Sequence, residues 1–178
     1  MNSIHRTAVM GILNITPDSF SDGGRFDSPD QAYKAAKRMA AQGADLIDLG
    51  AQSTRPGATD VGADTELERL LPVLKRLQQA RQEADLPAEL LFSIDTFLAP
   101  VARACLEAGA DWINDVSGGL ADPQMWPTIA DYGCPYVLMH RRGDARSMDS
   151  LAHYDDVVSE VETLSLIHIS EPTRPVPI

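Results

Sequence analysis

Apolar residues along this chain occur in five short runs, and the segments between the runs follow a different spacing. The runs are AVMGIL at 8–13, LIDL at 46–49, LLFSI at 90–94, WI at 112–113 with its flanks, and YVLM at 136–139. Runs this short are typical of buried strands, whereas the apolar residues between them recur with helical rather than alternating spacing. The pattern predicts a β-α unit that is repeated along the chain.

The segment between the first two runs predicts one crossover helix. Ser28-Pro29 suits its start, because proline is favoured in the first turn, and Gly43 suits its end, because glycine readily takes the left-handed conformation that terminates helices. The expected apolar stripe consists of Ala32, Ala36, Met39 and Ala40.

The next two connections also predict helices. Thr65 and Glu68 have the spacing of a capping box, and Pro72 is expected to kink the helix that follows. The apolar face of this second helix is expected at Leu67, Leu70, Leu71, Leu74 and Leu77. A third helix is expected over 99–108.

A helix-to-strand joint of the same sequence occurs twice, as Gly43-Ala44-Asp45 and as Gly109-Ala110-Asp111. Strands and helices that alternate in this way predict a parallel sheet with right-handed crossovers. The sheet is either an open, doubly wound one or part of a (β/α)8 barrel, and the periodicity alone does not choose between them.

Polar side chains follow the apolar runs and are expected at the carboxyl ends of the strands. In parallel α/β folds these ends form the ligand-binding face. One such residue alone is more typical of a turn or a helix cap, but a set of them indicates a common site. The set is Asn14, Asp48, Asp95, Asn114 and His140, of which His140 is left without an assigned role.

Two polar loops follow the first two strands. The loop 14–24 carries Phe20 and Asp22 and is interpreted either as a surface turn or as a lid over an aromatic ligand. The loop 52–57 places Thr54, Arg55 and Pro56 after a strand, where a hydroxyl and a guanidinium suit phosphate oxygens, although an exposed arginine in a turn is the alternative.

The overall charge narrows the range of partners. Of the 178 residues, 15 are Lys or Arg and 26 are Asp or Glu, which gives a formal net charge of -11 and disfavours nucleic acid and anionic membranes. Small-molecule substrates remain open. Cys105 and Cys134 lack the spacing of a zinc site or a disulfide framework, and no apolar run is long enough to span a membrane, so we expect a cytoplasmic protein with reduced thiols.

Several segments together resemble the dihydropteroate synthases. They are MGILNITPDSFSDGG at 10–24, GADLIDLGAQSTRPGA at 43–58, SIDTF at 93–97, INDVSGG at 113–119 and LMH at 138–140. The resemblance implies a TIM-type barrel, a role in folate biosynthesis and membership of a family that is a sulfonamide target, because sulfonamides resemble the second substrate. The implied reaction joins 6-hydroxymethyl-7,8-dihydropterin diphosphate to 4-aminobenzoate, with release of pyrophosphate and formation of 7,8-dihydropteroate.

The resemblance also implies roles for single residues. Asn14 would bind Mg²⁺, Thr54 and Arg55 would bind the diphosphate, and Asp95 and Asn114 would bind the pterin. Phe20 and Pro56 would wall the aminobenzoate pocket, and Asp48 and Asp22 are further substrate-binding candidates. Full-length members of this family are expected to form homodimers.

The chain departs from the family in three respects. Ala51-Gln52 stands where Gly-Glu is common, and Arg141-Arg142 stands where a less basic pair is common. Only about the first five β-α units of an α/β, TIM-type (β/α)8 barrel are expected, where closure needs eight. We therefore expect 1–163 to form a partial pterin-binding barrel domain that is inactive alone, followed by a non-native tail at 164–178. The alternatives are a non-catalytic pterin-binding module and a methyltetrahydrofolate-binding methyltransferase domain.

Overall fold

The computed structural model describes residues 6–15, 28–52, 61–143 and 147–169. Strands and helices alternate along these ranges, as the apolar runs predict. The strands are β1 (Met10–Asn14), β2 (Leu46–Gly50), β3 (Leu91–Asp95), β4 (Trp112–Asp115) and β5 (Tyr136–Leu138). The helices are α1 (Ser28–Ala41), α2 (Ala63–Gln82), α3 (Ala99–Glu107), α4 (Met125–Tyr132) and α5 (Val157–Ile169), with a 3-10 turn at Met148–Leu151.

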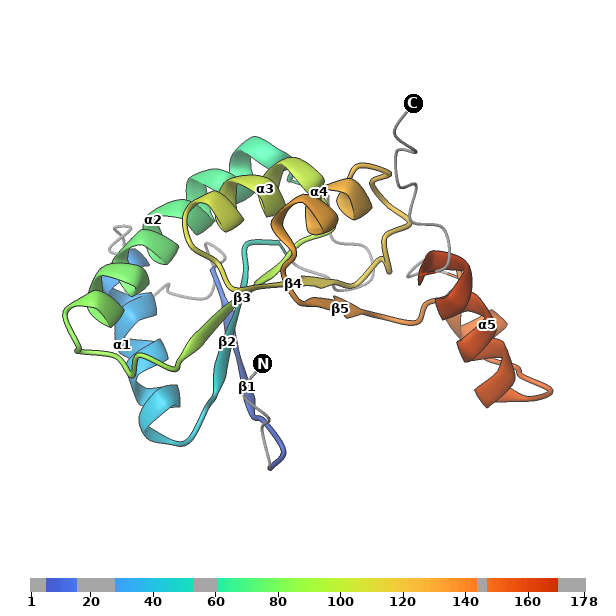
Figure 1. Cartoon of the computed structure of the whole chain (residues 1–178), viewed down its shortest axis with the longest axis horizontal. Coiled ribbons are helices and arrows are strands. Elements are labelled where there is room, and N and C mark those ends of the chain that lie inside the picture. The colour runs from blue at the N-terminus through green and yellow to red at the C-terminus, as the bar shows by residue number, and fades with distance from the viewer. Residues whose placement is uncertain (1–5, 16–27, 53–60, 144–146, 170–178) are drawn as a thin grey trace.

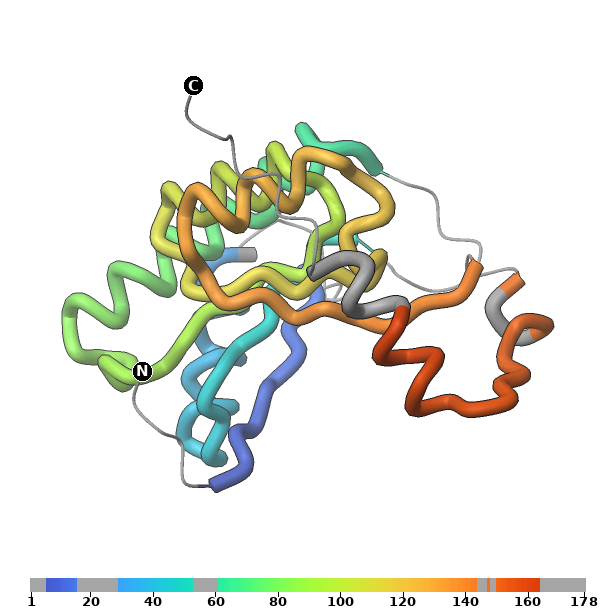
Figure 2. Tube along the Cα trace, turned by 45° about the vertical axis from the view of Figure 1, so that its right-hand side comes forward, coloured from blue at the N-terminus to red at the C-terminus, as the bar shows by residue number. Residues whose placement is uncertain are grey.

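The five strands form one parallel sheet in the order β1-β2-β3-β4-β5. A doubly wound sheet reverses its strand order at a switch point, whereas a (β/α)8 barrel adds each strand beside the previous one. Helices α1 to α4 lie along one side of the sheet and each contacts the next, while α5 lies apart from them beyond β5 (Figures 1 and 2). The described chain therefore has the arrangement of a partial barrel, which decides between the two predicted architectures.

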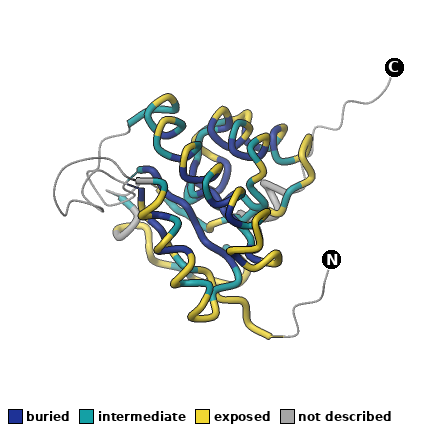
Figure 3. The backbone as a smooth tube through the Cα atoms, turned by 90° about the vertical axis from the view of Figure 1, so that its left-hand side faces the viewer, coloured by how far each residue is buried: buried dark blue, intermediate teal, exposed yellow. Residues whose placement is uncertain are grey.

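The core lies between the sheet and this layer of helices. Alternate strand residues face the helices and are buried, and the buried segments gather on the facing sides of helices and strands (Figure 3). The strand residues of this core are Leu13, Ile47, Leu49, Phe92, Ile94 and Ile113, each at most 5% exposed. The side chains between them point to the opposite face, which is the inner face of the barrel arc.

The predicted helices are largely confirmed, with one correction. Helix α1 begins at Ser28, and Ala32 and Ala36 of its stripe are fully buried. The capping box at Thr65 is wrong, because α2 already begins at Ala63, with Gly62 as its N-cap and no side-chain cap hydrogen bond. Thr65 therefore lies inside the first turn. Helix α2 continues past Pro72, and Leu70, Leu74 and Leu77 are buried while Leu67 and Leu71 are partly buried.

The repeated Gly-Ala-Asp joint has the same geometry at both places. Gly43 and Gly109 have φ of +100° and +95°, which explains the glycine at each position. The following aspartate accepts a hydrogen bond from a main-chain N–H of the preceding strand region and pairs with an arginine. Asp45 bonds Val9 N at 2.8 Å and Arg6, and Asp111 bonds Phe92 N at 2.9 Å and Arg81. The repeat in sequence is thus a repeated strand-entry joint at the amino end of the sheet.

Candidate functional site

Four strands place a row of side chains across the inner face at the carboxyl end of the sheet. The register pairs Asn14 with Gly50, Gly50 with Asp95, and Asp95 with Asn114. Because residues in register share a face, Asn14, Asp95 and Asn114 point to the same side. We call Asn14, Gly50, Asp95 and Asn114 the polar row. Three of the five predicted strand-end residues are thereby brought together.

Gly50 leaves an open space in the middle of the polar row. A Cβ at this position would lie 3.4 Å from Asn14 Oδ1 and 3.4 Å from Asp95 Oδ2. Two oxygen atoms from the neighbouring strands therefore face the same space, where glycine contributes no side chain. The row offers an amide oxygen and a carboxylate oxygen to whatever enters from the carboxyl end.

Asp48 lies in the middle of its strand and not at the carboxyl end, as had been expected. It is the middle residue of β2, in register with Ile12 and Ser93, so the expectation that it ends a strand is wrong. Its side chain still points to the inner face, because positions two apart on a strand, such as Asp48 and Gly50, lie on the same face. Asn114 Nδ2 donates a hydrogen bond to Asp48 Oδ2 at 2.9 Å, which connects the lower row to the polar row.

The carboxyl group of Asp95 has a strongly perturbed pKa. Burial, and to a smaller extent the nearby carboxylates of Asp48, Glu66 and Asp115, together raise this pKa from 3.8 to about 7. Each of the three destabilises a negative charge on Asp95. At neutral pH this carboxyl group is therefore close to the midpoint of its titration, a property often found at functional sites.

Helix α2 holds the carboxyl ends of β2 and β3 through buried or half-buried polar side chains. Glu66, which is 1% exposed, accepts a hydrogen bond from Thr96 Oγ1 at 2.9 Å. Arg69 Nη1 donates to the carbonyl oxygen of Ala51 at 2.7 Å. Neither residue is predictable from the local sequence, because a glutamate or an arginine in the first turns of a helix is ordinarily exposed.

Further hydrogen bonds are made by two residues next to the row, Gln52 and Asp115. Gln52 Oε1 accepts a hydrogen bond from Val61 N at 3.1 Å, which ties together the residues on either side of 53–60. Asp115 is fully buried and accepts hydrogen bonds from the N–H groups of Ser117 and Gly119 and from the Tyr136 hydroxyl. Burial, together with the hydrogen bond to Asp115, raises the pKa of the Tyr136 hydroxyl above its ordinary value. Asp115 is therefore a structural residue of the INDVSGG turn.

The remaining predicted residues divide into two groups. Phe20, Asp22, Thr54, Arg55 and Pro56 lie outside the described residues. His140, which was left without a role, has its Nε2 atom 3.0 Å from the Tyr154 hydroxyl and does not join the polar row. Both cysteines are free thiols; Cys105 is buried, which raises its pKa to about 12, and Cys134 is only half-buried.

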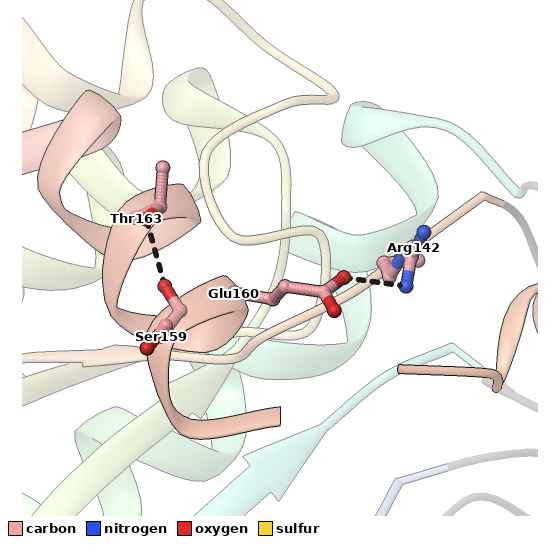
Figure 4. A pocket seen from close by; sticks show the side chains of 4 residues that line it. All are labelled: Arg142, Ser159, Glu160 and Thr163. Atoms are coloured by element: carbon pink, nitrogen blue, oxygen red, sulfur yellow. Dashed lines mark hydrogen bonds and ion pairs between the residues drawn. The ribbon is translucent and has the colours of Figure 1, made fainter. Parts of the chain in front are cut away.

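A pocket of about 350 Å³ lies elsewhere, between α5 and the segment after β5 (Figure 4). It is lined by Arg142, Ser159, Glu160 and Thr163. Arg142 Nη1 is 3.2 Å from Glu160 Oε2 and also donates to the carbonyl oxygen of His153. These contacts hold α5 to the end of the sheet, and none of the lining residues belongs to the polar row.

Across the described ranges, no cluster of three or more His, Cys, Asp and Glu side chains is arranged to hold a metal ion. In the same part of the chain, no helix combines the length and apolar character needed to cross a membrane.

A parallel sheet with helices on one side and a polar row at its carboxyl edge defines an α/β protein of the TIM-barrel class, with its candidate site on the inner face. Within this class, residues 10–171 match the family described as pterin binding enzyme, and the chain belongs to this family. The fold alone would not have named the family; the sequence match does.

Named relatives give the same result. The chain is 49% identical over 156 residues to dihydropteroate synthase from Synechocystis, which covers 88% of this chain and 52% of the relative. It is 47% identical over 146 residues to dihydropteroate synthase from Bacillus subtilis, with 82% and 49% covered. The chain therefore spans about half the length of the curated relatives it matches.

Solved structures agree in fold. A dihydropteroate synthase from Clostridium difficile, in the presence of pteroic acid, superposes with a TM-score of 0.80 at 41% identity, over 93% of this chain and 58% of the other. The Xanthomonas albilineans synthase with 4-aminobenzoic acid gives a TM-score of 0.76 at 43% identity, over 93% and 55%. The predicted resemblance to the family and the predicted partial barrel are both confirmed.

Proposed function

We propose that this chain supplies the pterin-binding part of a dihydropteroate synthase. The reaction joins 6-hydroxymethyl-7,8-dihydropterin diphosphate to 4-aminobenzoate and yields 7,8-dihydropteroate and pyrophosphate. The observation that carries the proposal is the polar row, because Asp95 and Asn114 lie side by side in register on the inner face. The named relatives favour this reaction over a methyltransferase.

The chemistry of the row suits the edge of a pterin ring. A pterin presents ring N–H and amino groups, which are donors, beside a carbonyl oxygen and a ring nitrogen, which are acceptors. Asp95 provides carboxylate oxygens that accept such donors when ionised, and Asn114 provides an amide that both donates and accepts. Both side chains are half-buried, so their hydrogen bonds to a ligand would form in a partly desolvated site.

The diphosphate and 4-aminobenzoate are assigned to residues predicted from the sequence. Thr54 and Arg55 are proposed to bind the diphosphate, and Phe20, Pro56 and Asp22 are proposed at the aminobenzoate side. The bond between Gln52 and Val61 supports the first assignment, because it fixes the two ends of the segment that carries Thr54 and Arg55. We propose that the domain spans 1–163, that it works in the cytoplasm, and that the full-length protein is a homodimer.

Mg²⁺ is the proposed metal, with Asn14 as its protein ligand. Asn14 Oδ1 and Asp95 Oδ2 both border the space above Gly50, so two hard oxygen donors face it, as Mg²⁺ requires. Magnesium often takes only one or two protein ligands and completes its shell with water and substrate phosphate, so the residues fit. When bound, the ion would stabilise negative charge on the departing pyrophosphate.

The protein residues then have an electrostatic task. Breaking the bond to pyrophosphate leaves positive charge on the dihydropterin, and the amine of 4-aminobenzoate attacks the carbon that carried the leaving group. The new C–N bond takes up the positive charge, and the nitrogen then releases one proton to solvent. Ionised Asp95 would stabilise that positive charge while Asn114 holds the ring in place. Because the leaving group departs with its own charge stabilised, no strong base is needed to start the reaction.

The test is dihydropteroate formation from both substrates with Mg²⁺. We would compare the chain alone with a chimera in which residues 1–163 replace the matching part of the Synechocystis synthase. We expect activity from the chimera and none from the chain alone, since the described residues of the latter form five of the eight strands that close a barrel. An inactive but folded chimera would contradict the proposed function.

Two variants of the chimera sharpen this test. Asp95→Asn and Asn114→Ala should each lower kcat/KM by about a hundredfold, since each removes contacts to the reacting ring. Asp131→Asn is the matched control, because Asp131 is exposed on α4 and pairs with Arg103. A chimera that binds pterin but makes no product would favour the non-catalytic pterin-binding module instead.

A further inference from the structure

Asp48 and Asn114 form a contact that spans three strands of the inner face. Asn114 belongs to the polar row, whereas Asp48 lies in the row below it on β2, two strands away. Asn114 Nδ2 lies 2.9 Å from Asp48 Oδ2, so the contact passes over β3. Asp48 is 4% exposed and Asn114 is half-buried, so the carboxylate lies beneath the amide.

This contact has a consequence for the orientation of the amide. An ionised carboxylate contains acceptors only, so it must be met by the NH₂ group of Asn114 and not by its oxygen. The amide is thereby held with one N–H directed at Asp48. Its Oδ1 atom and its second N–H remain for a ligand, as an acceptor next to a donor.

A second observation indicates that the layer below the polar row is not completed by protein contacts. Asp48 Oδ1 and Ser93 Oγ are both buried and have no hydrogen-bond partner within the described residues. Asp48 and Ser93 are paired in register on adjacent strands, so these two atoms belong to neighbouring positions. Buried polar atoms without a protein partner are uncommon, so two at neighbouring positions mark a place where a further hydrogen-bonding group would be stabilised.

We propose that Asp48 is a positioning residue that fixes the amide of Asn114, and that Asp48 and Ser93 form the polar floor of the site. The ligand edge selected by this arrangement carries a donor beside an acceptor, as in an aminopyrimidinone ring. This inference rests on the proposed function, in which Asn114 binds the pterin ring, and it assigns the residue that orients Asn114. Asp48 acts through Asn114 and is not itself a reacting group.

The first experiment follows the Asn114 side-chain amide by NMR of the full ¹⁵N-labelled chain, with the signals assigned by their loss in Asn114→Asp. In the unsubstituted chain, one of the two amide protons should exchange with water at least about tenfold more slowly than the other. In Asp48→Ala this protection should disappear, while Asp48→Asn, whose side-chain oxygen still accepts a hydrogen bond, should retain part of it. Equal exchange of the two protons in the unsubstituted chain would overturn the inference.

The second experiment measures binding of 6-hydroxymethylpterin to the same proteins by its fluorescence. Asp48→Ala should weaken binding by about tenfold or more and Asp48→Asn by about threefold, because a neutral acceptor makes a weaker bond than a carboxylate. Asp131→Asn should bind as the unsubstituted chain does. Unchanged binding in Asp48→Ala would overturn the positioning role.

The two measurements separate the two possible failures. If the unsubstituted chain binds no pterin but the Asn114 protection depends on Asp48, the proposed ligand fails and the positioning of Asn114 stands. If pterin binds and the protection is independent of Asp48, the proposed function stands and the inference fails. Asp48→Asn keeps the shape of the side chain, so it still decides the question if Asp48→Ala does not fold.

Discussion

The two ends of the sheet use the same residue type in opposite ways. At the amino end, Asp45 and Asp111 each accept a main-chain N–H and pair with an arginine. At the carboxyl end, Asp48 and Asp95 have no ion pair with any described cationic side chain. The bond to Val9 N and the pairing with Arg6 lower the pKa of Asp45, whereas burial raises that of Asp95. The amino end thus satisfies its carboxylates, whereas Asp95 at the carboxyl end keeps an oxygen atom directed at open space for a ligand.

The largest expected effect comes from removing the charge of Asp95. Because its folded pKa is about 7 and the ordinary value is 3.8, its contribution to stability is complete below pH 3.8 and is lost as pH rises through 7. Asp95→Asn should therefore raise the free energy of unfolding at pH 8 by at most about 4 kcal/mol, at about 1.4 kcal/mol per pKa unit. Urea titrations at pH 8 and pH 4 check this, and the gain should vanish at pH 4. An equal gain at both values would contradict the assignment.

The same titration should govern ligand affinity. If Asp95 binds pterin as a carboxylate, affinity should fall by up to about tenfold for each pH unit below 7, since protonation removes an acceptor. Binding of 6-hydroxymethylpterin between pH 5 and pH 8 measures this dependence. Asp95→Asn should bind weakly with no inflection near pH 7, and a persistent inflection in that variant would point to another group.

At the amino end, Asp111→Ala should destabilise the protein by about 1 to 3 kcal/mol, because it leaves Phe92 N without its acceptor and removes the ion-pair partner of the half-buried Arg81. Thermal and urea unfolding report this loss. In the active chimera the variant should change kcat/KM little at temperatures where it is folded. A large catalytic effect in a fully folded protein would contradict the assignment of a structural role to the amino end and of ligand binding to the carboxyl end.

The smallest effects are expected at the two glycines of the repeated joint. Gly43→Ala should cost about 1 kcal/mol, because φ is +100° there but no atom lies within 4 Å of the new methyl group. Gly109→Ala should cost more, since its methyl group would lie 2.8 Å from Gln78 Nε2, which also donates to the carbonyl oxygen of Gly109. Differential scanning calorimetry of the two variants measures the loss of stability in each, and a larger loss for Gly43→Ala would contradict the comparison.

Local signals in the sequence were sufficient for most elements of the fold. The start of α1 at Ser28 and the third helix near 99–107 follow from proline, glycine and apolar spacing, which act within a few residues. The choice between an open sheet and a barrel depends on strand order. Strand order is set by contacts between segments that are distant in the sequence, so local periodicity could not predict it. The prediction at Thr65 failed for a related reason. The sequence there has the spacing of a capping box, but the helix begins two residues earlier, so no cap forms at Thr65.

The site was partly predictable for the same reason. Asn14, Asp95 and Asn114 follow apolar runs directly, so their position at the carboxyl edge could be predicted. Asp48 was assigned to a strand end because it is polar inside an apolar run, and only the register shows that the strand continues past it. Glu66 owes its burial to the way α2 packs over Thr96, which no local pattern reveals.

The sequential strand order also bears on how the chain forms during its synthesis. Each strand pairs with the strand that precedes it, and each of α1 to α4 contacts the next helix along. Translation delivers residues from the amino end onward, so a new β-α unit always finds its docking surface already made. The β-α units can therefore fold one at a time during translation, because none of them requires a segment that is synthesised later.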